Sequence, residues 1–240
     1  MSKLYLVRHG QASFLSDDYD RLSELGFAQA KHVGDYWVAR GTTITAAACG
    51  TLKRQRDTAT AVADVFGAAE QGFPSLTVDA GFNEYPADEL MAHMLPLLRQ
   101  ADERIDADAR AFESAENARD KYRYVHRLLE AVMAAWVEDR IDVAEAGLPS
   151  WRRFSGGVRE ALRSLLADAP SGSSVALFTS GGPIGIAVQT VLDAPEIKAA
   201  ELNWRVHNAS ITEVTFSRKR LSLDTFNTVE HLPLDMRTYR

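Results

Sequence analysis

Side chains suited to phosphate chemistry stand at four separated points of the sequence. Arg8 and His9 are adjacent, and Arg54, Glu84 and the run Ser180-Gly181-Gly182 follow later. Two arginines can grip a phosphate through forked hydrogen bonds, and an imidazole between them can attack phosphorus. A carboxylic acid can protonate the leaving alkoxide, and backbone amides at the glycine turn can bind a phosphate oxygen. This set predicts metal-free phosphoryl transfer through a phosphohistidine.

The first of these points lies at the end of a predicted strand. Leu4–Val7 is a short apolar run that is typical of a buried parallel strand, and Arg8-His9-Gly10 follows it directly. Open α/β sheets bind ligands at the carboxyl ends of their strands. Gly10 lets the backbone turn without crowding a ligand. Gln11 and Ser13 come next and are candidates for the lining of the substrate entrance.

Three further apolar runs predict strands, at residues 44–49, 76–79 and 174–179. A helix follows the first run and carries Arg54 in its first turn. A non-helical stretch, residues 80–86, follows the second and carries Glu84. The third is the most convincing buried strand of the chain and ends at Ser180, before a helix that begins at Pro183. The candidate residues therefore all stand where strands end.

The remaining sequence predicts helices around one sheet. Ser23 is a plausible N-cap of a helix that Gly41 closes, and a loop is expected from Gly67 to Pro74. Another helix starts at Pro149-Ser150-Trp151, and residues 210–216 and 221–226 form a terminal antiparallel hairpin. The alternation of strands and helices predicts a three-layer α/β/α sandwich with a mostly parallel sheet. Residues 1–240 form a single domain in this prediction.

A change of composition marks an insertion in this domain. From about residue 88 to residue 146 the sequence turns to Ala, Glu, Asp and Arg with helical periodicity. We expect an inserted helical subdomain there, with Leu128, Leu129, Val132, Met133 and Trp136 on its clearest apolar face. Exposed apolar faces on such helices are compatible with a homodimer.

Composition excludes several functional classes. The 240 residues carry a net charge of −6, which argues against a nucleic-acid partner, and the basic run Arg218–Arg220 is interpreted as a solvated turn. No run of 18 apolar residues predicts a membrane span, and no separate signal peptide precedes the first strand. A single cysteine, Cys49, fits a reducing cytoplasm. The scattered histidines show no metal-ligand spacing, so no metal and no cofactor are expected.

Five short motifs, in order along the chain, resemble the histidine phosphatase superfamily, which is also called phosphoglycerate mutase-like. They are Leu6–Gly10, Leu22–Gly26 with Gln29-Ala30, Leu52–Arg54 with Thr58-Ala59, Phe82–Glu84 and Asn208–Thr212. The resemblance implies a phosphoglycerate mutase-like fold and a small phosphorylated substrate. It also implies that His9 is the nucleophile, that Arg8 and Arg54 bind phosphate, and that Glu84 is the general acid.

One departure from the family pattern concerns the chemistry. Where the family has a small residue followed by His-Gly after the late strand, this chain has Thr179-Ser180-Gly181. Ser180 keeps a hydroxyl donor but has a shorter reach and no positive charge. Loss of one preorganised donor typically costs about 3 kcal/mol, so the chemistry is expected to be weakened rather than abolished. His207 is a second source of an imidazole, although a structural role for it is favoured.

A second departure concerns the substrate. Glycolytic mutases of this family carry Trp-Asn shortly after Arg-His-Gly, and residues 11–15 lack both. The adjacent pair Arg152-Arg153 lies in a different context from the paired arginines of those mutases. The sequence therefore predicts a cytoplasmic phosphatase that hydrolyses small phosphomonoesters. A phosphoglycerate mutase-type phosphotransferase and a catalytically impaired phosphate-binding or scaffold protein are the alternatives.

Overall fold

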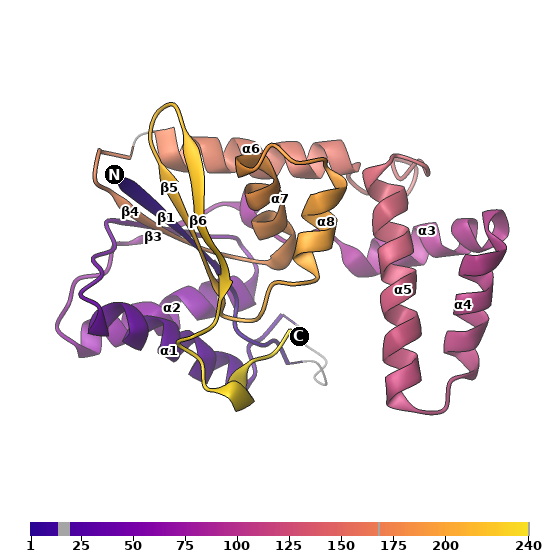
Figure 1. The fold of residues 1–240 in the computed structure, drawn as a ribbon, viewed down its shortest axis with the longest axis horizontal. Helices are drawn as coiled ribbons and strands as arrows, with labels where there is room; N and C mark the ends of the chain where they lie inside the picture. The colour runs from indigo at the N-terminus through magenta and orange to yellow at the C-terminus, as the bar shows by residue number, and fades with distance from the viewer. Residues whose placement is uncertain (14–19, 168, 240) are drawn as a thin grey trace. The chain divides into compact units, whose positions relative to one another are not determined.

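The computed structural model describes residues 1–13, 20–167 and 169–239 (Figure 1). The segment at residues 11–15, which lacks the Trp-Asn of the glycolytic mutases, ends with Phe14 and Leu15, and these two lie outside the described residues. The chain divides into two compact units. The first comprises Met1–Glu84 and Gly157–Arg240, and the second comprises Tyr85–Gly156.

The first unit is built on a six-stranded sheet with the order β3-β2-β4-β1-β5-β6. Its strands are β1 (Ser2–Arg8), β2 (Ala46–Cys49), β3 (Leu76–Val78), β4 (Ser174–Thr179), β5 (Ile211–Phe216) and β6 (Leu221–Thr228). Strands β3, β2, β4 and β1 run parallel, whereas β5 and β6 are antiparallel to their neighbours. The predicted mixed α/β fold with a mostly parallel sheet is confirmed.

Helices pack on both faces of this sheet (Figure 1). They are α1 (Glu24–Ala39), α2 (Lys53–Ala68), α6 (Trp151–Ala167, of which the part from Gly157 belongs to this unit), α7 (Gly181–Val191) and α8 (Ile197–Asn203). Val7 and Phe178 are buried in one apolar cluster with residues of α1 and α2. Leu6 and Leu177 are buried in another with residues of α6 and α7. Successive residues of a strand point to opposite faces, so two covered faces explain the continuous apolar runs.

The boundaries of some elements differ from the sequence prediction. Residues 80–86 are not wholly non-helical, because a 3₁₀ turn spans Ala80–Phe82 and the Asp79 carboxylate accepts the Gly81 N–H at 2.8 Å. Helix α7 begins at Gly181, two positions before Pro183, and α2 continues through Gly67 to Ala68. The short helix α8 and a 3₁₀ turn at Leu234–Met236 were not predicted. Short elements carry too few periodic positions to be recognised.

The second unit is helical. It contains α3 (Ala87–Ala101), α4 (Glu103–Ser114), α5 (Ala118–Val137) and the first turns of α6. The side chains of Asp102 and Asn117 accept backbone N–H groups at the starts of α4 and α5. The predicted apolar face of α5 is buried at Leu128, Val132, Met133 and Trp136. This unit includes the residues for which the sequence predicts an inserted helical subdomain.

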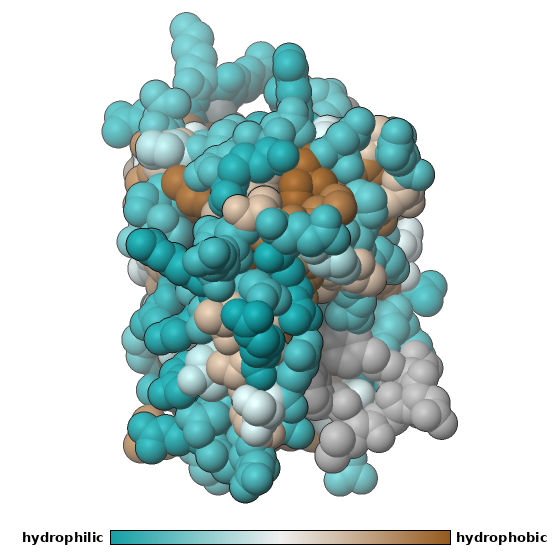
Figure 2. Space-filling view, turned by 90° about the vertical axis from the view of Figure 1, so that its right-hand side faces the viewer, coloured by the Kyte–Doolittle hydropathy of each residue, from teal (hydrophilic) through white to brown (hydrophobic). Residues whose placement is uncertain are grey.

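An aromatic cluster forms the core of the second unit. The Trp136 ring lies 5.2 Å from the Trp151 ring and 5.6 Å from the rings of Tyr85 and Phe154, measured between centroids. The Trp136 indole N–H donates to the Pro149 carbonyl at 2.9 Å. The face of the molecule in Figure 2 is largely hydrophilic, with a small group of hydrophobic residues in its upper half.

A close backbone approach fixes the loop after β1 against α1. A Cβ atom added at Gly26 would lie 2.2 Å from the Gln11 carbonyl oxygen, and one added at Gly10 would lie 2.2 Å from the Gly26 carbonyl oxygen. Neither contact can be relieved by a side-chain rotation, because both involve backbone atoms. The start of α1 is also held by its N-cap, where Ser23 Oγ accepts the Gly26 N–H at 3.0 Å.

We expect Gly26→Ala to lower the free energy of unfolding by about 1–3 kcal/mol, because the backbone of the loop or of α1 must shift. Gly67→Ala is the matched control, since a Cβ added at that position of α2 meets nothing within 4 Å. The control is expected to be neutral or to stabilise by up to about 1 kcal/mol. Urea unfolding of both variants measures the difference, and equal stability of the two would contradict the close approach.

Candidate active site

The backbone of His9 continues the sheet beyond β1. Its N–H donates to the Thr179 carbonyl at 2.9 Å, next to the register pair Arg8 and Thr179. Its carbonyl accepts from the Ala209 N–H at 3.2 Å and from Asn208 Nδ2 at 3.3 Å. Hydrogen bonds from two neighbouring segments therefore fix the residue in position, and its side chain is 5% exposed.

The imidazole of His9 is neutral, and its Nε2 carries the lone pair. Nδ1 lies 2.7 Å from the Gly10 carbonyl, which can only accept, so Nδ1 bears the proton. Nε2 accepts the Arg54 Nε–H at 3.2 Å. Burial, together with the charges of Arg8 and Arg54, holds the pKa of His9 well below 6.5. An unprotonated nitrogen beside a guanidinium is the form that can attack phosphorus.

Arg54 lies in the first turn of α2, and an acidic side chain fixes its guanidinium. The residue is 9% exposed, and its Nη1 pairs with Asp20 Oδ1 at 2.8 Å. Asp20 Oδ2 accepts the Lys53 N–H at 2.7 Å, so one carboxylate fixes both the start of α2 and the guanidinium. Sequence analysis missed Asp20, because only its contact with a distant arginine marks it. Arg56, in the same helix, is exposed.

Arg8 lies at the same end of the sheet and is bound by the C-terminal part of the chain. Its Nη1 donates to the Tyr239 carbonyl at 2.8 Å and also to the Val206 carbonyl. The His207 ring stacks on the Tyr239 ring with 3.9 Å between centroids, and its Nδ1 lies 3.3 Å from the Asn227 Oδ1. Burial lowers the pKa of His207. These contacts account for His207 as a structural residue, as favoured from the sequence.

Glu84 lies against the start of α7. Its two carboxylate oxygens accept the Gly182 N–H at 3.1 and 3.2 Å. A carboxylate at a helix N-terminus is favoured by the helix dipole. From the sequence, this amide is expected to face a phosphate oxygen; in the structure it donates to Glu84. A Cβ at Gly181 would lie 2.1 Å from Asn203 Oδ1, so a larger residue at this helix start would have to displace the Asn203 side chain.

Ser180 is fully buried and contacts a residue that sequence analysis missed. Gln55 Nε2 donates to Ser180 Oγ at 2.9 Å and to the Phe82 carbonyl at 3.0 Å. Gln55 is also fully buried. Its position directly after Arg54 in the first turn of α2 is the only signal that the sequence offers.

Gln11 and Ser13, the predicted entrance residues, are tied to the segment before α1. Gln11 Oε1 accepts from Ser23 Oγ at 3.0 Å, and the Ser13 N–H donates to the Arg21 carbonyl at 2.8 Å. The structure thus brings His9, Arg54, Arg8, Ser180 and Glu84 to one end of the sheet. It gives Gln11 and Ser13 contacts within the adjoining loop.

Two further properties concern the described part of the chain only. No group of three or more His, Cys, Asp or Glu residues there has the arrangement of a metal site. No helix there is both long and apolar enough to cross a membrane.

A family comparison decides the assignment of the fold. The model of the histidine phosphatase superfamily (branch 1) matches residues 4–132 and 96–229. The chain belongs to this superfamily. The resemblance read from the five sequence motifs is thereby confirmed. No curated protein matches the chain.

Solved structures share the fold over nearly the whole chain. YhfR of Bacillus stearothermophilus is 17% identical, with a TM-score of 0.64, and the match covers 96% of this chain and 99% of that one. A mycobacterial glucosyl-3-phosphoglycerate phosphatase is 23% identical, with a TM-score of 0.58 and coverages of 94% and 98%. A phosphoserine phosphatase of Entamoeba histolytica, solved with 3-phosphoglyceric acid, is 17% identical, with a TM-score of 0.60 and coverages of 97% and 100%.

The contact between Gln55 and Ser180 predicts how a histidine at position 180 would change the stability of the protein. Ser180→His alone is expected to destabilise by about 1–3 kcal/mol, because an imidazole overpacks a site that Gln55 already fills. In the double variant Gln55→Ala/Ser180→His the ring gains room, so this variant should be more stable than Ser180→His. Urea unfolding gives the comparison. A Ser180→His variant as stable as the wild type would show that Gln55 does not limit the space.

Proposed function

We propose that this superfamily member is a phosphatase that hydrolyses small phosphomonoesters through a phosphohistidine on His9. The observation that carries the proposal is the neutral, buried imidazole with its Nε2 lone pair 3.2 Å from Arg54 Nε. Two of the structural relatives are phosphatases, named for glucosyl-3-phosphoglycerate and for phosphoserine, and they support the same reaction class.

In the first step His9 Nε2 attacks the phosphorus atom, and the bond between phosphorus and the ester oxygen breaks. Glu84, in its carboxylic acid form, gives its proton to the departing oxygen, so the product leaves as an alcohol. Arg54 and Arg8 stabilise the negative charge on the phosphoryl oxygens. Asp20 holds Arg54 in place during this step.

In the second step water attacks the phosphorus atom of phospho-His9. Glu84, now a carboxylate, accepts a proton from that water, and the bond between phosphorus and Nε2 breaks. Inorganic phosphate leaves, and both His9 and Glu84 return to their starting protonation states. These steps use only side chains of this chain, so we expect turnover to persist in the presence of EDTA.

The remaining parts of the proposal concern the setting of the reaction. We expect a cytoplasmic location, which the single buried cysteine, Cys49, supports. A homodimer is a further expectation, supported by exposed apolar residues of the second unit such as Leu97 and Tyr122. Light scattering at several protein concentrations tests it.

The alternative function is phosphate binding without turnover, and the observation behind it is the uncharged Ser180 at a position where the family has a histidine. A mutase is the other alternative. Binding of inorganic phosphate with no His9-dependent release would favour the binding protein. Transfer of the phosphoryl group between hydroxyls of a sugar acid would favour the mutase.

We expect His9→Ala to abolish phosphate release from p-nitrophenyl phosphate and to prevent formation of an acid-labile phosphoprotein. Arg54→Ala should lower kcat/KM by roughly 10²–10³, because a preorganised charged donor is lost. Arg56→Ala is the matched control, since this arginine of the same helix is exposed, and it should change kcat/KM by less than about twofold. Activity of His9→Ala equal to the wild type would refute the proposal.

The acid limb of the pH profile follows from the charge state of His9. The pKa of His9 is lowered well below 6.5, so the imidazole stays neutral and nucleophilic as the pH falls through 6.5. Protonation removes the lone pair only at lower pH. The decline of kcat/KM due to His9 should therefore lie well below pH 6.5, measured from steady-state kinetics. A decline of kcat/KM centred at or above pH 6.5 would contradict a buried, neutral nucleophile if replacing the other titratable residues of the site did not remove it.

A further inference from the structure

Two consecutive residues of α2 reach the ends of two neighbouring strands. Arg54 donates to His9 after β1, and Gln55 donates to Ser180 after β4. Strand register explains this arrangement. Val7 pairs with Phe178, and both point to the face that α1 and α2 cover. Two residues further along the strands, His9 and Ser180 point to the same face, because side chains alternate with a period of two.

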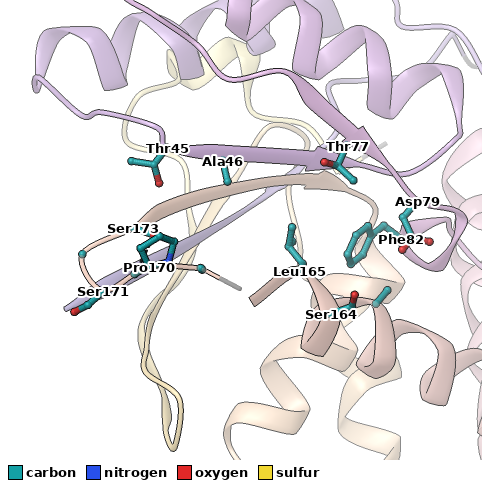
Figure 3. A pocket seen from close by; sticks show the side chains of 13 residues that line it. Thr45, Ala46, Thr77, Asp79, Phe82, Ser164, Leu165, Pro170, Ser171 and Ser173 are labelled. Carbon is teal, nitrogen blue, oxygen red and sulfur yellow. Dashed lines mark hydrogen bonds between the residues drawn. The ribbon is translucent and has the colours of Figure 1, made fainter. Parts of the chain in front are cut away.

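The orientation of the Gln55 amide is fixed by the Phe82 carbonyl. A carbonyl oxygen can only accept, so the NH₂ group of Gln55, and not its oxygen, faces Phe82 at 3.0 Å. The same carbonyl accepts from Thr179 Oγ1 at 2.6 Å, and the Phe82 ring lines a separate pocket of about 560 Å³ on the sheet side of α6 (Figure 3). The Phe82 carbonyl thus fixes the orientation of the Gln55 amide.

The second hydrogen of this NH₂ group decides the role of the Ser180 hydroxyl. It points at Ser180 Oγ, which must therefore act as the acceptor in that hydrogen bond. The Ser180 hydroxyl faces the Gln55 Nε2, which can only donate, and the Gln55 Oε1 has no hydrogen-bond partner among the residues that the structure describes. No acceptor for the Ser180 hydroxyl proton is found among those residues either. Both side chains are fully buried. A buried donor without an acceptor raises the free energy of the folded protein. A ligand oxygen that accepts the Ser180 hydroxyl proton would remove this cost.

We propose that Gln55 and Ser180 form a neutral donor pair, in which the Ser180 hydroxyl donates to a phosphoryl oxygen during attack by His9. Ser180 contacts the reacting group and is the catalytic member of the pair. Gln55 acts through Ser180 and is a positioning residue. This inference rests on the proposed function, and it deepens it by assigning an uncharged donor beside the two arginines.

The pair has a chemical consequence for the phosphoryl group. Neither member titrates in the physiological range, so the donor remains in place at every pH at which the protein is folded. Among the described residues that we place at the phosphoryl group, Arg8 and Arg54 then carry the positive charge that faces its oxygens. Loss of the pair should lower kcat by the same factor at every pH and leave the shape of the pH profile unchanged. A change in the pKa of His9 would instead move the acid limb of the profile.

The test is a double-mutant cycle of Ser180→Ala, Gln55→Met and the double variant, assayed with p-nitrophenyl phosphate. Methionine fills a volume close to that of glutamine and cannot donate. Ser180→Ala should lower kcat on the order of 10²-fold with little change in KM. Gln55→Met should lower kcat about 10-fold in the wild type and cause no further loss in the Ser180→Ala background, since contacting residues couple.

Gln189→Met is the matched control. Gln189 is a buried glutamine of α7 that donates to the Ala194 carbonyl, away from the proposed site, and its replacement should leave kcat unchanged. The proposal is overturned if Gln55→Met costs the same factor in both backgrounds, or if Ser180→Ala keeps the wild-type kcat. A shift of the acid limb in either single variant would also overturn it. Thermal unfolding confirms that each variant is folded.

Failure of the proposed function can be told apart from failure of this inference. If the wild-type protein releases no phosphate from any phosphomonoester, the proposed function has failed, and the pair is then judged by binding of orthovanadate in isothermal titration calorimetry. A dissociation constant raised about 10-fold or more in Ser180→Ala supports the donor, as expected for a hydrogen bond to a charged group. Equal affinity for the wild type and Ser180→Ala overturns it.

Discussion

A buried imidazole held between a carbonyl and a guanidinium is the contact on which the rest of this site depends. The Gly10 carbonyl sets the tautomer of His9, and Arg54 donates its Nε–H to the unprotonated Nε2. Neither the Gly10 carbonyl nor the Arg54 guanidinium could form its hydrogen bond with the His9 ring if it lay a few ångströms further away. The loop after β1 and the start of α2 must therefore be fixed with the accuracy of a hydrogen bond. The glycine contact between the loop and α1 and the Asp20 carboxylate at α2 provide that accuracy.

The layered fold explains why these groups meet. Parallel strands place their carboxyl ends along one edge, and β1 and β4 lie side by side at the centre of the sheet. Helix α2 packs on one face with its N-terminus at that edge, so its first turn reaches both strand ends. Glu84 and the start of α7 meet at the same edge, where the Gly182 amide holds the carboxylate. Arg54 and Gln55 are adjacent in sequence, yet one contacts the end of β1 and the other contacts the end of β4.

Much of this arrangement could be predicted from the sequence, for a physical reason. Apolar runs such as Leu4–Val7 predict central strands, and residues that follow such runs must gather at one edge, as Arg8, His9, Arg54 and Ser180 do. Asp20 and Gln55 could not be found in this way, because their roles depend on side-chain contacts across distant parts of the chain. The partner of the Gly182 amide was likewise unpredictable, since a phosphate and a carboxylate satisfy a helix start equally well.

The hydrogen bond between Arg8 and the C-terminal segment has a consequence for where tags and labels are attached to the protein. The Tyr239 carbonyl binds the guanidinium directly, and the Thr238 hydroxyl accepts from Gln29 and donates to Asn208, which in turn donates to the His9 carbonyl. An affinity tag fused after these residues would begin next to the Arg8 guanidinium. At the opposite end of β1, Met1 is 98% exposed. Fusions, surface immobilisation and fluorescent labels therefore belong at the N-terminus, at the other end of β1 from Arg8 and His9.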